Sequence, residues 1–118
     1  VTIYGDGTQK RDFTFVDDIA RGRIAGLKPL GYEIINLGSD TPVVLMDTIR
    51  EIESLTGRDA NLVFEPSHPA DVYATWADIS KAERLLDWRP QTSYRDGIAA
   101  LVRWYQDNRE WAKDISTD

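Results

Sequence analysis

The sequence has no cysteine and a single histidine, and these shortages exclude whole classes of site. Without cysteine the chain has no disulfide, no iron–sulfur cluster, no Cys-ligated zinc and no catalytic thiol. One histidine leaves no HExxH pair and no multi-histidine metal site. We therefore expect no metal centre. The lack of cysteine also fits a reducing compartment, and we expect a cytoplasmic protein.

Positive charge and long apolar runs are also scarce. Fourteen Lys and Arg stand against twenty Asp and Glu, which gives a net charge of −6. A nucleic-acid binder holds phosphates with clustered Lys and Arg, so we expect no nucleic-acid partner. No apolar run approaches the roughly 20 residues that a membrane helix needs, so we expect no membrane partner either.

The sequence does contain enough apolar and aromatic residues for one folded domain. Its 118 residues are 42% hydrophobic, with four Trp, five Tyr and three Phe. These values are typical of a globular chain, and the length corresponds to a single domain over residues 1–118. Residues 1–4 already read as a strand, with no initiator Met before them. We therefore expect this domain to be a piece of a longer protein.

The spacing of apolar residues predicts a mixed α/β (α+β) layer fold. It changes along the chain between periods of two and of 3.6 residues. We expect about four helices and four short strands. The strands are expected at residues 1–4, 13–16, 32–37 and 61–64. The helices are expected from a cap at Asp17 or Asp18 to about residue 28, from 45 to Gly57, from a cap at Asp78 to 86, and from a cap at Ser93 to about Trp111.

None of the common catalytic templates is present in the sequence. Gly5-Asp6-Gly7 has Lys10 where a dinucleotide-binding fingerprint has its third glycine. The chain has no P-loop, and His68 has no GxSxG elbow to serve. We therefore predict that this chain carries no catalytic residue.

A binding site has better support from the residues themselves. The glycine turn at residues 5–7 precedes Lys10 and Arg11, and the guanidinium fork of arginine suits bidentate recognition of phosphate. The alternative is that Arg11 pairs with a surface carboxylate such as Asp12 or Asp17. The residues alone leave both interpretations open.

Several motifs, in order, resemble one known family. They are YGDGTQKRDFTFVDD at residues 4–18, NLGS at 36–39, Asp71 followed by ADISKA at 77–82, LLDWRP at 85–90 and Gly97-Ile98. Together they resemble the C-terminal, substrate-binding lobe of extended short-chain dehydrogenase/reductases, the NAD-dependent epimerase/dehydratase family. Within it, the chain is most similar to 4-epimerases of UDP-glucuronate and UDP-glucose.

The resemblance implies a lobe that binds a UDP-sugar, beside an N-terminal Rossmann lobe that binds NAD and oxidises and reduces C4 of the sugar. The family's Tyr-x-x-x-Lys pair belongs to that first lobe, and no tyrosine here has a lysine four residues later. We therefore expect this chain to lack the Rossmann lobe, to bind no NAD by itself and to be inactive alone. Family members are usually homodimers through the Rossmann lobe, so we expect a dimeric full-length protein and a monomeric fragment.

The resemblance also assigns roles to individual residues. Arg11 matches the arginine that contacts the diphosphate, and Asp71 matches the acid near the ribose and diphosphate. Thr2 and Tyr4 match positions along the uracil, where backbone groups often make the bonds. Val43 matches an apolar wall near the nucleotide.

At two positions the chain departs from the family pattern. His68 stands where the family commonly has Arg, or Gln in some members, and Ala70 replaces a usual Gly. We hypothesise that His68 replaces the second phosphate contact, which would make nucleotide affinity rise as the pH falls through its pKa. A UDP affinity that stays constant between about pH 5 and 8 would refute this hypothesis.

Two alternative functions stay open. One is the corresponding lobe of a related nucleotide-sugar dehydratase or decarboxylase. The other is a free-standing, non-catalytic binding domain. Exposed apolar surface would favour a missing partner lobe, whereas a polar exterior would favour an independent domain.

Overall fold

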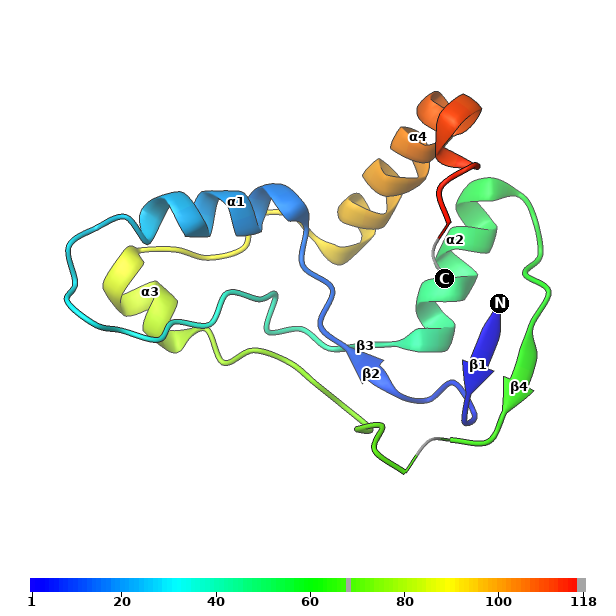
Figure 1. Cartoon of the computed structure of the whole chain (residues 1–118), viewed down its shortest axis with the longest axis horizontal. Helices are drawn as coiled ribbons and strands as arrows, with labels where there is room; N and C mark the ends of the chain where they lie inside the picture. The colour runs from blue at the N-terminus through cyan, green and yellow to red at the C-terminus, as the bar shows by residue number, and fades with distance from the viewer. Residues whose placement is uncertain (68, 117–118) are drawn as a thin grey trace.

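The computed structural model describes residues 1–67 and 69–116 and shows a mixed α/β fold, which confirms the predicted class. No helix within these ranges is both long enough and apolar enough to cross a membrane. The described residues form four helices and four short strands (Figure 1). In chain order they are β1 (Thr2–Tyr4), β2 (Lys10–Arg11), α1 (Val16–Ala25), β3 (Val43–Val44), α2 (Leu45–Thr56), β4 (Val63–Glu65), α3 (Ser80–Leu86) and α4 (Tyr94–Ala112).

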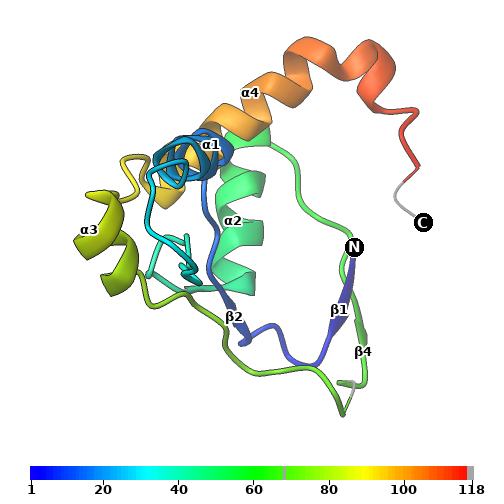
Figure 2. The same cartoon turned by 60° about the vertical axis from the view of Figure 1, so that its left-hand side comes forward.

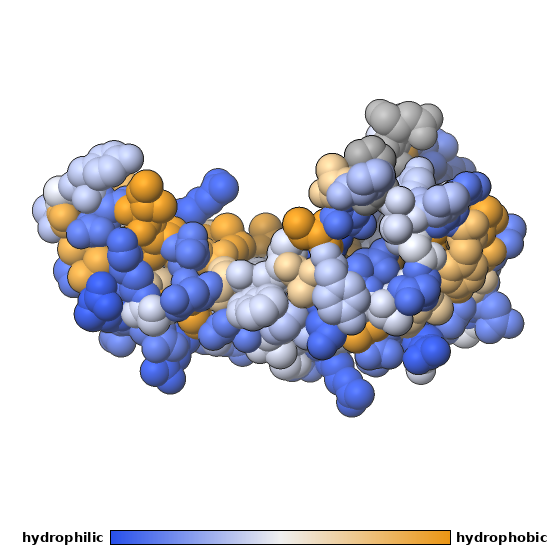
Figure 3. Space-filling model, turned by 90° about the horizontal axis from the view of Figure 1, so that it is seen from below, coloured by the Kyte–Doolittle hydropathy of each residue, from blue (hydrophilic) through white to orange (hydrophobic). Residues whose placement is uncertain are grey.

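The elements form an open, elongated arrangement of 48 × 37 × 25 Å. Helices α1 and α3 lie at one end and the β1–β4 ribbon lies at the other, in both views (Figures 1 and 2). The β2–β3 pair lies between them, and α2 packs against α4. The space-filling view shows a saddle with apolar side chains in the floor between two raised ends (Figure 3).

The strands pair in two separate two-stranded sheets. Strand β1 runs parallel to β4, with Thr2 opposite Val63, whereas β2 runs antiparallel to β3, with Arg11 opposite Val43. The strand predicted at residues 1–4 is therefore confirmed. The one predicted at 61–64 lies slightly later in the chain, at Val63–Glu65.

Two of the predicted helix ends are confirmed in detail. Helix α2 ends at Gly57, which has a φ of 66° in the left-handed region and closes the helix as a C-cap. Helix α4 begins after Ser93, whose Oγ accepts a hydrogen bond from the backbone N–H of Asp96 at 3.1 Å. Both ends follow from groups a few residues apart, which is why the sequence alone predicts them.

The predicted cap of α1 is wrong. The helix begins at Val16, and its N-cap is Phe15, which supplies no side-chain hydrogen bond. The Asp18 carboxylate is buried and accepts the backbone N–H groups of Gln91 at 3.0 Å and Thr92 at 2.9 Å instead. A remote loop therefore uses the side chain that the local pattern assigned to a cap.

The cap of α3 is shifted by one residue from the prediction. Its N-cap is Ile79, and the helix runs over Ser80–Leu86. The carboxylate of Asp78 still accepts the backbone N–H of Ser80, at 2.9 Å.

The strand predicted at residues 13–16 is also wrong. Residues 12–15 have no ladder partner among the described residues, and Val16 already belongs to α1. The ladder forms earlier, at Lys10–Arg11, because its partner is Val43–Val44, which the sequence did not single out as a strand. Strand positions depend on a partner distant in sequence, and such a partner is not visible from local spacing.

The strand predicted at residues 32–37 is absent as well. The segment joins no ladder among the described residues. Ile35 and Leu37 pack against the core, whereas Tyr32 and Ile34 are 88% and 69% exposed. The segment thus has apolar side chains on both faces, but the described residues cover only one face.

A small core holds α1 and α3 together. Its centre is Trp88, which is 2% exposed and lies with Ile79 and Ala82, and its indole Nε1 donates to the backbone O of Asp18 at 3.0 Å. At Gly22 in α1, a Cβ would lie 3.0 Å from Trp88 Nε1 and closer still, at 2.7 Å, to Leu37. The glycine therefore lets the helix approach this core without displacing the Leu37 side chain.

Candidate functional site

Arg11 and Asp71, which the resemblance assigned to a nucleotide site, lie in direct contact. Nη2 of Arg11 donates to Oδ1 of Asp71 at 2.6 Å, and the two side chains are 30% and 35% exposed. Nη1 donates to the backbone O of Lys10 at 2.8 Å and of Val72 at 3.0 Å. The carboxylate partner of Arg11 is thus neither Asp12 nor Asp17.

These bonds hold the guanidinium of Arg11 but leave some of its N–H donors unused. They engage three of the five N–H donors that an arginine carries, and no other partner is found within residues 1–67 and 69–116. The backbone carbonyls of Lys10 and Val72 fix the orientation of the fork. Arg11 is therefore held in place with donors left for an anion.

A cavity of about 470 Å³ lies beside this ion pair. It opens between the glycine turn after β1 and the segment that leads away from β4. Tyr4 and Asp71, two of the predicted site residues, are in its wall. The full lining is Tyr4, Gly5, Asp6, Thr8, Gln9, Ser67, Asp71, Val72 and Tyr73.

The other predicted residues take different places. Val43 is the ladder partner of Arg11, so it adjoins the ion pair from β3. Thr2 lies on β1 opposite Val63, two residues before the cavity wall begins, and its side chain is exposed. His68 lies outside the described residues, so its hypothesised phosphate contact stays a prediction.

The turn that forms one cavity wall is held by its own side chains. The carboxylate of Asp6 accepts the backbone N–H of Thr8 at 3.0 Å and its hydroxyl at 2.6 Å. The bond from the Thr8 hydroxyl, followed by the one from its backbone, lowers the pKa of Asp6. Gln9 Nε2 donates to the backbone O of Tyr4 at 3.0 Å across the turn. Sequence reasoning found the glycines of this turn but missed the part played by Gln9.

Sequence reasoning also missed Asp12, which lies directly after β2. Its carboxylate accepts hydrogen bonds from Ser39, both backbone and hydroxyl, and from the backbone N–H groups of Asp40 and Ala77. Burial raises the pKa of Asp12, but the bonds from Ser39 and Ala77 outweigh that effect and hold the pKa below its usual value. No sequence signal could have found these donors, because they lie 27 to 65 residues away.

The described residues form neither a dinucleotide-binding fingerprint nor a cluster of candidate metal ligands. Gly5 and Gly7 lead into β2 rather than into a helix N-terminus, which a dinucleotide fingerprint requires. No group of three or more His, Cys, Asp or Glu side chains in the described part of the chain could hold a metal ion. Arg11 itself is not part of the cavity wall, and it adjoins the cavity through its ion pair with Asp71.

A family model and known relatives match this chain. The model described as GDP-mannose 4,6 dehydratase matches residues 1–101. The chain is 52% identical over 116 residues to a UDP-glucuronate 4-epimerase of Thermodesulfobacterium geofontis, which covers 98% of this chain and 36% of the relative. It is also 31% identical to UDP-glucuronic acid decarboxylase 2 of Arabidopsis thaliana, over 87% of this chain and 23% of that protein.

A solved structure shows the same fold. It is the UDP-glucuronic acid 4-epimerase of Bacillus cereus in complex with UDP-glucuronic acid and NAD, and the TM-score is 0.82 at 40% identity. The match covers 91% of this chain and 35% of that one. The chain thus spans about a third of the length of the relatives it matches.

Proposed function

Because the chain belongs to the GDP-mannose 4,6 dehydratase family, we propose that it is the substrate-anchoring lobe of an NAD-dependent nucleotide-sugar 4-epimerase. The proposed substrate is UDP-glucuronate or UDP-glucose, and the proposed partner is an N-terminal Rossmann lobe. The observation that carries the proposal is the cavity beside the Arg11–Asp71 pair, in a chain 52% identical to a UDP-glucuronate 4-epimerase.

The lobe would act by holding the nucleotide while the sugar reacts elsewhere. Arg11 would bind the diphosphate with its remaining donors, and Asp71 would keep the guanidinium turned toward the cavity. Val43 would supply an apolar wall on the other side of Arg11, with Tyr4 and Thr2 along the base. Binding energy from the nucleotide would then position the sugar, as expected when a remote part of a substrate is used for orientation.

The charges of the cavity suggest that this lobe does not bind the nucleotide strongly by itself. Two carboxylates, those of Asp6 and Asp71, are in its wall, and both would repel a diphosphate. Arg11 offsets part of that repulsion. Further cations would have to come from the other lobe or from His68. We therefore propose that NAD binding, catalysis and most of the nucleotide affinity require the full-length protein, and that the fragment alone is inactive.

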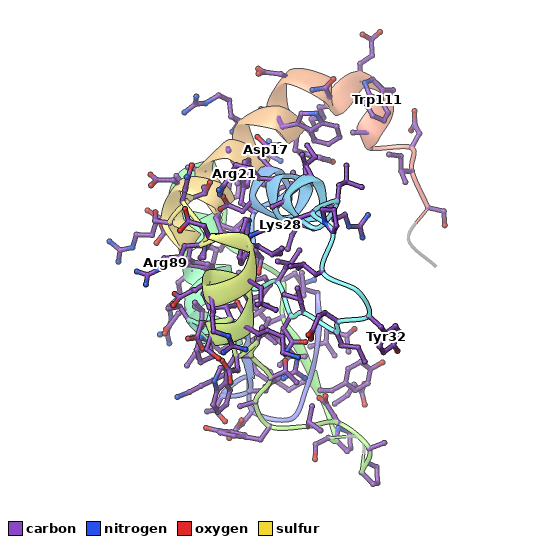
Figure 4. All side chains as sticks on the ribbon, turned by 90° about the vertical axis from the view of Figure 1, so that its left-hand side faces the viewer. Asp17, Arg21, Lys28, Tyr32, Arg89 and Trp111 are labelled. Carbon is purple, nitrogen blue, oxygen red and sulfur yellow. The ribbon has the colours of Figure 1, made fainter. Side chains whose placement is uncertain are left out.

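The exposed apolar surface supports a missing partner lobe. Residues 32–37 join no ladder among the described residues and leave the side chains of Tyr32 and Ile34 exposed. In Figure 4, Tyr32 projects outward on the side opposite Arg89. Large apolar side chains exposed together are typical of a surface that another part of the protein covers. We therefore propose that the Rossmann lobe covers this segment.

A second apolar feature lies beside α1. A groove of about 710 Å³ runs between residues 13–17 and the first half of α4, and it includes Val16, Leu101 and Trp104, which are 68%, 54% and 47% exposed. An apolar hollow of this kind on a soluble domain indicates an interaction surface. It favours a lobe of a larger protein over a free-standing binding domain. A dimeric full-length protein and a cytoplasmic location stay predictions.

The test of the proposed function is UDP binding by the polypeptide that the whole gene encodes. Arg11→Ala should remove one or two charge-assisted hydrogen bonds of roughly 1.5–3 kcal/mol each, which corresponds to about a ten-fold to hundred-fold weaker affinity or more. Arg58→Ala, at an exposed arginine after α2, is the matched control and should leave the affinity unchanged. An unchanged dissociation constant for Arg11→Ala would rule out its assignment.

One related activity keeps specific support. The 31% identity to a UDP-glucuronic acid decarboxylase makes the lobe of a decarboxylase the second candidate. The coding sequence upstream of Val1 separates an enzyme lobe from a free-standing binding domain, because a GxxGxxG strand–turn–helix and a Tyr-x-x-x-Lys pair would identify an enzyme. A start codon close to Val1, with neither motif, would identify a free-standing binding domain. Incubating the encoded enzyme with UDP-glucuronate then distinguishes epimerisation from loss of CO₂.

A further inference from the structure

We propose that Asp12 is a positioning residue whose carboxylate clamps the strand of Arg11 between the two segments that carry Val43 and Asp71. The inference rests on the proposed nucleotide site and adds a residue to which the resemblance assigns no role. Asp12 would not touch the nucleotide. It would act by keeping three site residues in register.

Strand β2 is the middle one of three adjacent segments. On one edge it pairs with β3, where Arg11 lies opposite Val43. On the other edge, the backbone N–H of Lys10 donates to the O of Tyr73 at 2.8 Å, and the N–H of Thr75 donates to the O of Lys10 at 3.3 Å. The two segments that flank β2 in space both lie more than thirty residues later in the chain. The site is therefore assembled across β2 from parts that are distant in sequence.

The Asp12 carboxylate joins both neighbours of β2 at the end of the strand. Its Oδ1 accepts the backbone N–H of Ser39 at 2.9 Å and the Ser39 hydroxyl, in the turn that precedes β3. Its Oδ2 accepts the N–H of Ala77 at 3.0 Å, at the end of the segment on the opposite edge, and that of Asp40 at 3.2 Å. One side chain thus connects three parts of the chain.

The approach of these parts leaves no room for a further side chain. A Cβ at Gly38 would lie 2.4 Å from the Cβ of Ala77 and 2.7 Å from Oδ2 of Asp12. Any side chain at position 38 would therefore push Ala77 or the Asp12 carboxylate out of place. The glycine therefore allows the turn and the 71–77 segment to meet at the carboxylate.

Replacing Asp12 by asparagine should open one side of this clamp. An amide has one oxygen, so its NH₂ group must face either the donors of Ser39 or those of Asp40 and Ala77. The NH₂ group would then face other N–H or O–H donors without an acceptor. The segment that carries those donors would separate from β2. Arg11 depends on the same neighbours, because it donates to Val72 and Asp71 in the 71–77 segment.

The experiment compares Asp12→Asn with Asp18→Asn in the polypeptide that the gene encodes. Asp18 is the matched control, since it is also a carboxylate that accepts two remote backbone N–H groups, but it lies on α1. The first readout is hydrogen exchange at the amides of Lys10 and Thr75, relative to that of Val63, which donates to the O of Val1 in the other sheet. Asp12→Asn should raise this ratio about tenfold or more, equivalent to about 1.4 kcal/mol of local opening.

The control variant should leave that ratio unchanged even though it lowers global stability. If Asp12→Asn accelerates exchange at Lys10, Thr75 and Val63 equally, its role is general stability and the proposal is wrong. Should Asp12→Asn fail to fold, Ser39→Ala carries the same comparison, because it removes a single donor to Asp12. An unchanged ratio for Ser39→Ala would then overturn the proposal.

The second readout is UDP affinity measured by calorimetry. Asp12→Asn should weaken UDP about tenfold, and the same change should matter much less when Arg11→Ala is already present, because Asp12 acts through Arg11. Fully additive effects would contradict this dependence. If the unaltered polypeptide does not bind UDP, the proposed function fails, whereas the exchange ratio still decides the role of Asp12.

Discussion

Asp18 offers the sharpest test of how a buried carboxylate holds this fold. It is 2% exposed and accepts the backbone N–H groups of Gln91 and Thr92, as well as a bond from the Arg21 guanidinium. These contacts tie the start of α1 to the loop before α4. We expect Asp18→Asn to loosen that connection without changing the size of the side chain.

The size of the effect follows from the hydrogen bonds. Whichever way the amide turns, its NH₂ group faces the N–H of Gln91 or of Thr92, and one partly buried donor loses its acceptor at a cost of about 1–3 kcal/mol. The remaining bond changes from a charged to a neutral acceptor, which costs about 1 kcal/mol more. The free energy of unfolding should therefore fall by roughly 2–4 kcal/mol, a large share of the 5–15 kcal/mol typical of a domain.

Urea denaturation at pH 7, followed by tryptophan fluorescence, measures this loss. Trp88 is a suitable reporter because its indole donates to the backbone O of Asp18. The matched control is Asp17→Asn, at the exposed neighbouring carboxylate in the first turn of α1, which should cost less than about 1 kcal/mol. Equal urea midpoints for the original chain and Asp18→Asn would refute the reasoning.

The stability difference between the original chain and Asp18→Asn should also depend on pH. Burial raises the pKa of Asp18, whereas the N–H groups of Thr92 and Gln91 lower it by more, so the net shift is downward from 3.8. The carboxylate therefore adds stability above pH 3.8, and that stability is lost as the pH falls through the folded pKa. Asparagine does not titrate there, so the difference between the two proteins should shrink in acid. A difference of the same size at pH 7 and at about pH 3 would contradict this account.

Three further predictions concern the core, a helix end and the uncovered segment. Gly22→Ala should lower the free energy of unfolding by about 1–3 kcal/mol in urea titrations, because its Cβ meets Leu37 and Trp88. Ser93→Ala should cost about 1 kcal/mol in the same assay through loss of the α4 cap. Amides 33–37 should exchange rapidly in the 118-residue chain and slowly in the polypeptide that the gene encodes; rapid exchange in both would show that no other lobe covers them.

The strands show why local sequence patterns have limits. Residues 32–37 carry a strong strand pattern, yet they join no ladder among the described residues. Lys10–Arg11 and Val43–Val44 carry weaker patterns and form a ladder. The difference is the presence of a partner strand, which supplies the hydrogen bonds that an extended backbone needs. The local spacing of apolar residues indicates which segments could form a strand. Whether a strand forms depends on a second segment that supplies hydrogen-bond partners.

The candidate site divides in a similar way. The residues alone pointed to Arg11 beside a glycine turn as a candidate for phosphate binding or for a surface ion pair, and the resemblance assigned it to the diphosphate and added Asp71 and Val43. The geometry came from the fold: a 2.6 Å ion pair across sixty residues, with Val43 opposite Arg11 in a ladder. Asp12 had no sequence signal at all, because its donors are backbone groups that any residue carries.

The sequence by itself determined the mixed α/β class, the four helices and the ends of α2 and α4. Each of these depends on composition or on groups within a few residues of one another along the chain. Only the tertiary structure decided which strands pair, which carboxylates are buried and which side chains surround Arg11. Those features depend on hydrogen-bonding groups that are remote in sequence and meet only when the chain has folded.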